Sequence, residues 1–207
     1  MRVLDLDAQQ AWQYENGFHL VCDVSRTGKL LAHYELYKMA SDLPGAVVEC
    51  GVYKGASLVQ WATFRDLLEN SASRPIVGFD VFDAFPQPDH PADLAFLDRW
   101  NAGVEGVVMS KEDLEAVLAH KGLNNVVLVK GDINETVPRY VADNPHLKIA
   151  LLHIDTDIYA PSKTALECLY DHVVRGGVIV LDDYGAVYGE TKRSEEHTSE
   201  LQSRLHL

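Results

Sequence analysis

Five short apolar runs alternate with helix-like segments along this chain, and that alternation is the strongest constraint on its fold. The runs are rich in valine, isoleucine and leucine, as strands buried on both faces of a parallel sheet are. Strands are expected at 46–50, 75–80, 126–129, 149–154 and 178–181, and helices at 29–43, 57–68, 110–120, 135–142 and 161–174. Strands that alternate with helices predict an α/β fold with a parallel sheet and helices on both faces.

Composition sets the size of the fold and excludes some partners. The 207 residues, 47% of them hydrophobic, suit one globular domain with a buried core. A net charge of -13 argues against a nucleic-acid partner, and no basic stripe would hold the chain to an anionic membrane. No apolar stretch approaches the roughly 20 residues of a transmembrane helix, and the N-terminus lacks the apolar run of a signal peptide. We therefore expect a cytoplasmic protein without nucleic-acid or membrane partners; whether it forms homo-oligomers stays open.

Carboxylates gather at the ends of two predicted strands. Asp155 and Asp157 follow the fourth strand, and Asp182 and Asp183 follow the fifth. Losing hydration beside a buried sheet is costly for a carboxylate, and a divalent cation offsets that cost. Because the carboxyl ends of neighbouring parallel strands meet at the ligand-binding edge, Asp155, Asp182 and Asp183 can converge on one ion. Oxygen ligands favour Mg²⁺ over zinc, and Asp157 is placed to act as general base for a hydroxyl near the metal.

Plainer interpretations of these residues stay open. The four acids could be helix caps and turn residues, which need no cation. His153, inside the fourth strand, fits a hydrogen-bonded core histidine better than a metal ligand.

A glycine-rich turn joins the first strand to the next helix and contains Glu49, Gly51, Gly55 and Ser57. Glycine lets a ligand approach the backbone, and the helix N-terminus offers N–H donors. The spacing is not GxGxxG, so it lacks the dinucleotide fingerprint. The form ExGxxxGxS instead resembles the first motif of class I S-adenosylmethionine (SAM) methyltransferases.

Two further acids extend this candidate nucleotide pocket. Asp80 ends the second strand, where a carboxylate can accept both ribose hydroxyls of an adenosine ligand. Asp132 follows the third strand, where it would either frame the adenine or cap a helix.

Taken together, these motifs resemble the macrocin O-methyltransferase (TylF-type) family of metal-dependent sugar methyltransferases. The resemblance covers most of residues 30–192 and is carried by the segments 48–55, 78–86, 131–133, 153–161 and 176–185. It implies a Rossmann-like class I methyltransferase fold, SAM and Mg²⁺ as cofactors, and a sugar or glycosylated natural product as the small-molecule acceptor. It also implies that Asp155, Asp182 and Asp183 hold Mg²⁺, that Asp157 is the base, and that the SAM site is lined by Glu49, Gly51, Ser57, Asp80 and Asp132.

Two other functions remain as alternatives. One is a catechol-type O-methyltransferase with the same metal chemistry and a phenolic acceptor, and the other is a truncated, non-catalytic SAM-binding module. The walls of the acceptor pocket would decide, but their sequence is uninformative. Residues 1–28 predict a cap, a lid or a docking segment, and residues 82–106 predict a mobile loop with a short helix at 94–100.

The last fifteen residues differ from the rest of the chain. Residues 193–203 resemble the in-frame translation of a sequencing-library adaptor, so we expect a methyltransferase domain at 1–192 and an artefactual or disordered tail at 193–207. Members of this fold normally carry an antiparallel pair of strands after the fifth strand, and we expect that pair to be missing. The fifth strand would then be an apolar edge, and the chain would be poorly soluble or partly unfolded.

Overall fold

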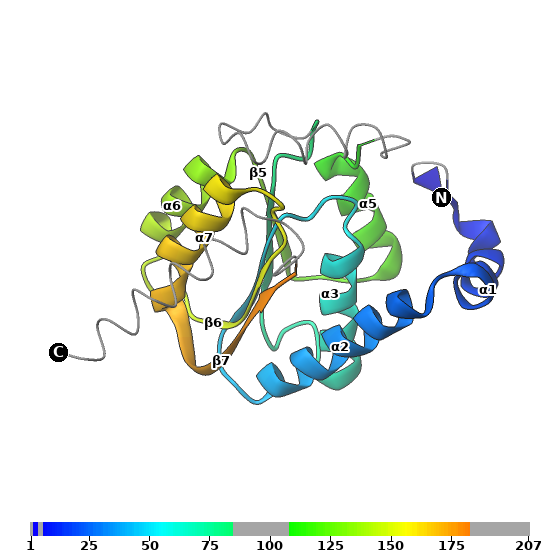
Figure 1. The fold of residues 1–207 in the computed structure, drawn as a ribbon, viewed down its shortest axis with the longest axis horizontal. Coiled ribbons are helices and arrows are strands. Elements are labelled where there is room, and N and C mark those ends of the chain that lie inside the picture. Colours follow the sequence, from blue (N-terminus) through cyan, green and yellow to red (C-terminus); the bar gives the residue numbers. More distant parts are fainter. Residues whose placement is uncertain (1, 4–5, 85–107, 183–207) are drawn as a thin grey trace.

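A five-stranded sheet forms the centre of the computed structural model, and its neighbouring strands are all parallel (Figure 1). The structure describes residues 2–3, 6–84 and 108–182. In spatial order the strands are β5 (Val126–Lys130), β4 (Ile76–Asp80), β3 (Ala46–Cys50), β6 (Ile149–Ile154) and β7 (Val173–Leu181). The predicted α/β fold with a parallel sheet is confirmed.

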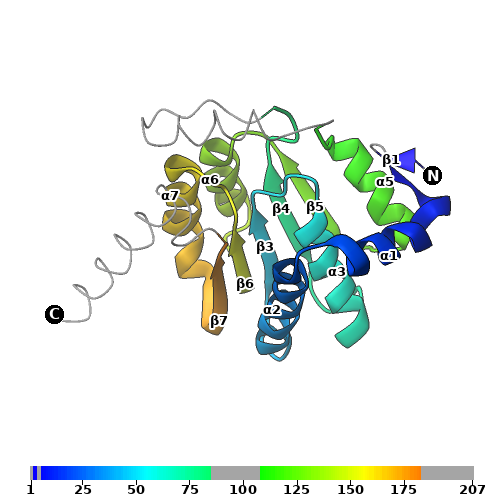
Figure 2. The same cartoon turned by 45° about the vertical axis from the view of Figure 1, so that its right-hand side comes forward.

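Helices cover both faces of this sheet (Figure 2). One face carries α2 (Val24–Ser41), α3 (Ala56–Leu68) and α5 (Lys111–Lys121), and the other carries α6 (Ile133–Asp143) and α7 (Tyr159–Leu169).

Side chains of the central strands alternate between two apolar cores, as the pleat of a strand requires. Val47 in β3 belongs to the core that contains Tyr37 of α2 and Trp61 of α3. Its neighbour Val48 belongs to the core on the other face, with Leu169 of α7. Every residue of β3 and β6 is buried, so a charged side chain in these strands faces a loss of hydration.

The end of the sheet differs from the sequence prediction. The helix expected at 161–174 ends at Leu169, a 3₁₀ turn covers Tyr170–His172, and β7 begins at Val173 rather than at residue 178. The predicted boundaries were wrong because the glycine pair after Arg175 does not form a turn before the strand.

The glycine pair lies inside β7, at an irregularity of its pairing with β6. Val173 pairs with Ile149 and Val178 with Leu151, so β7 bulges between these two pairs. Gly176 takes a φ of +84° in the bulge, a conformation that favours glycine. Glycine therefore lets the strand start early and still reach the edge of the sheet in register.

The N-terminal residues form small elements outside the main sheet. A two-stranded antiparallel pair joins β1 (Arg2–Val3) to β2 (Leu6–Asp7), and a 3₁₀ turn (Ala8–Gln10) leads into α1 (Ala11–Val21), which buries none of its residues. The predicted helix at 94–100, Asp183, the two further strands and the tail lie outside the described residues. Within the described ranges, no helix combines the length and apolar character needed to cross a bilayer.

Candidate active site

The predicted site residues of the central strands lie where those strands end. The backbone N–H of Gly51 donates to the carbonyl of Phe79 at 2.9 Å, and that of Asp155 donates to Cys50 at 2.8 Å. The N–H of Asp182 donates to Ile154 at 3.1 Å. These bonds extend the sheet by one residue, so the glycine turn and the two acids share the carboxyl edge that commonly binds ligands in such sheets.

Asp155 and Asp182 converge on one ammonium group. The Nζ atom of Lys29, from the first part of α2, lies 2.6 Å from Asp182 Oδ2 and 3.9 Å from Asp155 Oδ2. All three side chains are partly buried, with exposed fractions between 18% and 34%. The predicted meeting of these two acids is therefore present, and a lysine that the sequence prediction did not include joins them.

The charges of this cluster shift the pKa values of its members. Burial lowers the pKa of Lys29, but the hydrogen bond to Asp182 and the charge of Asp155 outweigh it, and the pKa rises above its ordinary value. Burial raises the pKa of Asp182, yet His153, His33 and Lys29 outweigh that effect and hold it well below its ordinary range. At neutral pH the pair is therefore ionic.

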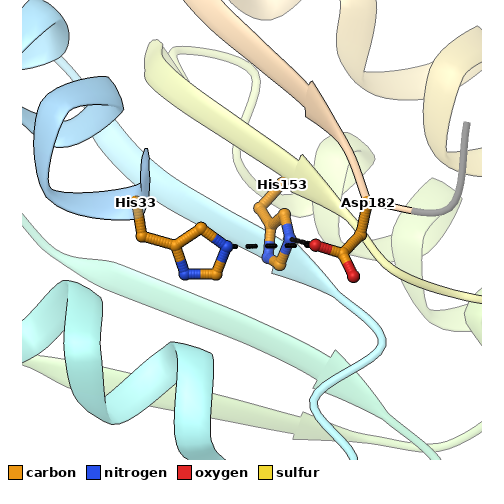
Figure 3. A group of neighbouring side chains, drawn as sticks. All are labelled: His33, His153 and Asp182. Carbon is orange, nitrogen blue, oxygen red and sulfur yellow. Dashed lines mark ion pairs between the residues drawn. The ribbon is translucent and has the colours of Figure 1, made fainter. Parts of the chain in front are cut away.

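Two histidines face the other oxygen of Asp182 (Figure 3). His153 Nε2 lies 3.6 Å and His33 Nε2 lies 3.9 Å from Asp182 Oδ1. The Nδ1 atom of His33 lies 2.9 Å from Oε1 of Gln60, which fixes the orientation of that ring. These three side chains come from α2, β6 and the end of β7, so the site depends on the packing of α2 against the sheet.

Glu49 and His153 connect the acids to the glycine turn. Both side chains are fully buried, and His153 Nδ1 lies 3.8 Å from Glu49 Oε1. Ser57 Oγ donates to the same Glu49 oxygen at 2.5 Å. Burial disfavours the charged ring of His153, but Asp182 and Glu49 on its two sides outweigh it and raise its pKa to about 10. His153 is a buried core histidine as expected, but neither ring nitrogen makes the expected hydrogen bond, and both face carboxylates at ion-pair distance.

Only glycine fits at position 51, because the backbone at Asp155 passes close to it. Gly51 takes a φ of +88°, and a Cβ atom at this position would lie 1.8 Å from the carbonyl oxygen of Asp155. The glycine therefore brings the turn of the predicted cofactor site into contact with the backbone of a predicted metal ligand.

The carboxylate of Asp80 binds the glycine turn itself. Its Oδ2 accepts the N–H groups of Val52 and Tyr53 at 2.7 and 2.9 Å, and its Oδ1 accepts that of Phe82 at 2.7 Å. Asp80 thus fixes the turn at the edge of the sheet. Asp132 is exposed and caps α6 by accepting the N–H of Asn134 at 2.8 Å, which is the helix-cap alternative considered from the sequence.

Asp157, the predicted base, has an unusual backbone conformation. Its φ is +62°, which is uncommon for a residue other than glycine, and its side chain is partly buried. Such a conformation costs free energy and tends to occur where function constrains the chain. Asp157 lies two residues beyond Asp155 on the loop that leads into α7.

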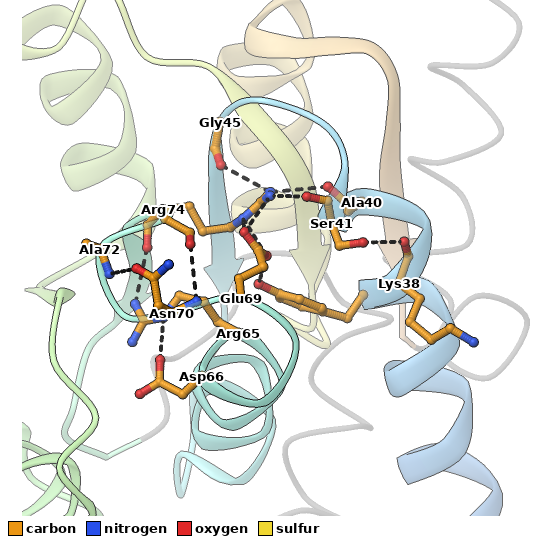
Figure 4. Close-up of polar contacts among 12 residues, drawn as sticks. Lys38, Ala40, Ser41, Gly45, Arg65, Asp66, Glu69, Asn70, Ala72 and Arg74 are labelled. Atoms are coloured by element: carbon orange, nitrogen blue, oxygen red, sulfur yellow. Dashed lines mark hydrogen bonds and ion pairs between the residues drawn. The ribbon is translucent and has the colours of Figure 1, made fainter.

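A second buried polar cluster lies at the opposite edge of the sheet and serves as a contrast (Figure 4). Arg74 donates to the carbonyls of Ala40 and Ser41 at 3.2 and 2.6 Å and to Glu69 Oε2, which closes the end of α2. A cavity of about 540 Å³ also opens there, partly lined by Arg74 and His146, away from the strand-end acids.

The two clusters differ in how well their polar atoms are paired. Among the described residues, buried side-chain atoms without a hydrogen bond are Glu49 Oε2, Trp61 Nε1 and both ring nitrogens of His153. Three of these four atoms belong to the carboxyl-edge cluster, and none belongs to the arginine cluster. A buried polar atom without a hydrogen bond is costly, and this cost distinguishes the carboxyl edge from the arginine cluster.

The sequence prediction did not include Lys29, His33 or Gln60. Lys29 and His33 are four residues apart on one helix, a spacing that places them on the same face. That spacing was a usable signal, but only the packing of α2 shows that this face meets Asp182.

Two kinds of donor atom lie at this edge. Asp155 and Asp182 offer carboxylate oxygens, and the ring nitrogens of His33 and His153 lie with one oxygen of Asp182 within 4.8 Å of one another. The two carboxylates converge on one cationic group, the Lys29 ammonium. Carboxylate oxygens at a partly exposed position are the ligands that Mg²⁺ prefers. The third predicted ligand, Asp183, lies outside the described residues.

Comparison with known proteins identifies the family. The sequence profile of the macrocin-O-methyltransferase (TylF) family matches residues 29–203, a range that begins at Lys29. The chain belongs to this family. The match runs through the acids at both strand ends, and the predicted family resemblance is confirmed. It also extends across the segment that resembles an adaptor.

Two characterised relatives are similar to this TylF-family chain. One is the 8-demethyl-8-(2,3-dimethoxy-alpha-L-rhamnosyl)-tetracenomycin-C 4'-O-methyltransferase of Streptomyces olivaceus, 28% identical over 70% of this chain and 55% of the relative. The other is the mycinamicin III 3''-O-methyltransferase of Micromonospora griseorubida, 26% identical over 83% of this chain and 67% of the relative. The chain thus spans little more than half of the first relative.

Solved structures of related proteins have the same fold. A calicheamicin methyltransferase is 29% identical, with a TM-score of 0.68 over 92% of this chain and 78% of that protein. The O-methyltransferase NovP, at 22% identity, superposes with a TM-score of 0.71 over 84% of this chain and 72% of that protein. The predicted Rossmann-like class I methyltransferase fold is confirmed.

Proposed function

We propose that this chain carries the catalytic core of a Mg²⁺-dependent O-methyltransferase that moves a methyl group from SAM to a hydroxyl of a sugar or a glycosylated natural product. The observation that carries the proposal is the convergence of Asp155 and Asp182 on one cationic group beside the Gly51 turn. The family supports it, because the names of its relatives describe O-methylation, one of them of a rhamnosyl-bearing compound. A related structure is named as a TDP-rhamnose 3'-O-methyltransferase.

In this proposal the SAM site is lined by Glu49, Gly51, Ser57, Asp80 and Asp132. SAM supplies a methyl group on a positively charged sulfur, so the donor needs no further activation. Asp80 shapes the turn that receives the cofactor through its bonds to three backbone N–H groups. Ser57 donates to the buried side chain of Glu49 and holds it beside the turn.

The metal and the proton are assigned to neighbouring acids. Asp155 and Asp182, with Asp183 as the third predicted ligand, would hold Mg²⁺. When bound, the ion supplies positive charge that lowers the pKa of a nearby hydroxyl. Asp157, two residues beyond Asp155 and with a backbone φ of +62°, accepts the proton of that hydroxyl on its carboxylate. Positioning of acceptor, base and donor contributes the remainder of the rate.

A transfer assay tests the reaction and its acceptor. Purified chain is incubated with radiolabelled SAM and either TDP-rhamnose or catechol, and S-adenosylhomocysteine is measured. We expect product with TDP-rhamnose, its loss in EDTA, and its recovery when Mg²⁺ is added. Product with catechol alone would favour the phenolic acceptor, and an undiminished rate in EDTA would remove the metal from the proposal.

Variants of two neighbouring acids should separate metal binding from proton transfer. We expect Asp155→Asn to lose both Mg²⁺ binding and turnover. Asp157→Asn should keep Mg²⁺ and SAM binding, measured by calorimetry, while turnover falls by about 10²–10⁴-fold. Asp143→Asn, an exposed residue at the end of α6, is the matched control and should change neither. Unchanged turnover in Asp157→Asn would exclude it as the base.

A further inference from the structure

Lys29 sits where a divalent cation would be expected to act. Its ammonium group lies 2.6 Å from Asp182 Oδ2 and 3.9 Å from Asp155 Oδ2, the two carboxylates that the proposed function gives to the metal. The proposed reaction gives this lysine no role. We propose that Lys29 is a built-in counter-ion of the Asp155–Asp182 pair, which a divalent cation must displace in order to bind. The proposal rests on the metal site of the proposed function.

Without a metal, the site carries the negative charges of the Asp155 and Asp182 carboxylates. Two carboxylates that are only 25% and 18% exposed repel each other and have lost part of their hydration. The Lys29 ammonium, together with the His153 ring on the other oxygen of Asp182, offsets these charges without any ion from solution. Lys29 therefore keeps the two carboxylates close together before a divalent cation binds.

Lys29 and a divalent cation cannot occupy the same carboxylates together. Lys29 already donates a short, charge-assisted hydrogen bond to Asp182 Oδ2. A divalent cation on the same carboxylates would place its two positive charges beside those of Lys29 and His153, and like charges at such distances repel strongly. Occupancy by the lysine and by the ion is therefore competitive.

The Lys29 ammonium group is able to move away from the two carboxylates. Its side chain is 34% exposed, the largest fraction among the three residues, and it ends a flexible four-carbon stem. The ammonium group can move into water by rotation of the side chain alone. His33, one helical turn further on, is 4% exposed and bonded to Gln60, so it stays in place when Lys29 moves.

A matched lysine on the same helix provides the control. Lys38 pairs with Glu35 at 3.1 Å on the same helix, and both side chains are exposed. Lys38→Met removes one positive charge from α2, as Lys29→Met does, without touching the Asp155–Asp182 pair. A difference between the two variants therefore reports the local contact, and not the net charge of the chain.

The experiment measures binding of Mg²⁺ and Mn²⁺ by calorimetry to the wild-type chain and to variants. We expect Lys29→Met to bind either ion at least about 10-fold more tightly, because the competing cation is gone. Lys29→Arg should bind more weakly than wild type, because a guanidinium group can engage both carboxylates. Lys38→Met should match wild type. Thermal unfolding in EDTA gives a second readout, in which Lys29→Met should melt at a lower temperature than wild type and recover most of that loss when Mg²⁺ saturates the site.

The outcomes distinguish this inference from the function on which it rests. Equal or weaker ion binding by Lys29→Met, with clear binding by wild type, would overturn the counter-ion role and leave the metal site standing. If neither protein binds Mg²⁺ or Mn²⁺, the metal part of the proposed function fails, and the counter-ion role fails with it.

Discussion

Asp182 is the residue at which most of the charged groups of the site meet. One of its oxygens contacts Lys29, and the other faces His33 and His153 at ion-pair distance. The sequence predicted that Asp182 binds a cation, because a carboxylate that loses hydration at the end of a buried strand is costly unless a positive charge offsets it. It did not predict Lys29 and His33, because their approach depends on the position of α2 over the sheet.

The charge of His153 should make the stability of the fold depend on pH. Folding raises the pKa of this ring from 6.5 to about 10, so its stabilising contribution is complete below pH 6.5 and is lost as the pH rises through about 10. We expect the free energy of unfolding to fall over this window by up to about 1.4 kcal/mol per pH unit. Urea denaturation at pH 6.5, 8 and 10 measures it.

A glutamine variant isolates the contribution of His153 from other groups that titrate in the same range. His153→Gln should remove most of this pH dependence, whatever its stability at pH 6.5. His146→Gln, at an exposed position, should retain it. Parallel pH profiles for wild type and His153→Gln would show that the buried ring is neutral in the folded chain.

At the scale of elements, the strand ends were the most predictable feature of the sequence. β3 and β6 have the predicted bounds because their apolar runs stop where an acid or a glycine reaches the edge of the sheet. The start of β7 was not predictable, because Gly176 and Gly177 are typical of a turn and here form a bulge within the strand. The sequence alone does not distinguish a glycine pair in a turn before a strand from one in a bulge within the strand.

The contact between the glycine turn and the loop after β6 should be a sensitive point of the fold. A methyl group at position 51 would lie 1.8 Å from the Asp155 carbonyl oxygen, and both backbones are fixed by the sheet. We expect Gly51→Ala to lower the free energy of unfolding by at least about 3 kcal/mol and to abolish SAM binding. Chemical denaturation and calorimetry measure the two effects.

Gly122 is the matched control for the backbone strain of this substitution. It also has a positive φ, of +70°, but an added Cβ would meet nothing within 4 Å. Gly122→Ala should therefore cost only about 1–2 kcal/mol and should leave SAM binding unchanged. Equal losses in the two variants would mean that the close approach of Gly51 and Asp155 has no special role.

At the scale of the whole molecule, the sequence predicted the layers correctly and left the surroundings of the site open. Alternating apolar runs and helices specify a parallel sheet with two covered faces, and the chain has that architecture. The N-terminal 28 residues carry no periodic apolar pattern, so the sequence did not predict α1 or the start of α2 at Val24. The domain limits, the tail and the two further strands remain predictions.

We propose that the cofactor and a divalent cation bind at adjacent but separate groups of residues on the carboxyl edge of the sheet. Within the described part of the chain, Asp182 faces Lys29, His33 and His153, and it reaches the glycine turn only through His153 and Glu49. Removing its charge should therefore affect one ligand and not the other.

Calorimetric titration of Mg²⁺ into chain already saturated with S-adenosylhomocysteine tests this claim most directly. For wild type we predict one Mg²⁺ per chain. For Asp182→Asn we predict loss of Mg²⁺ binding, with the affinity for S-adenosylhomocysteine unchanged within about twofold. Undiminished Mg²⁺ binding by Asp182→Asn would contradict the account.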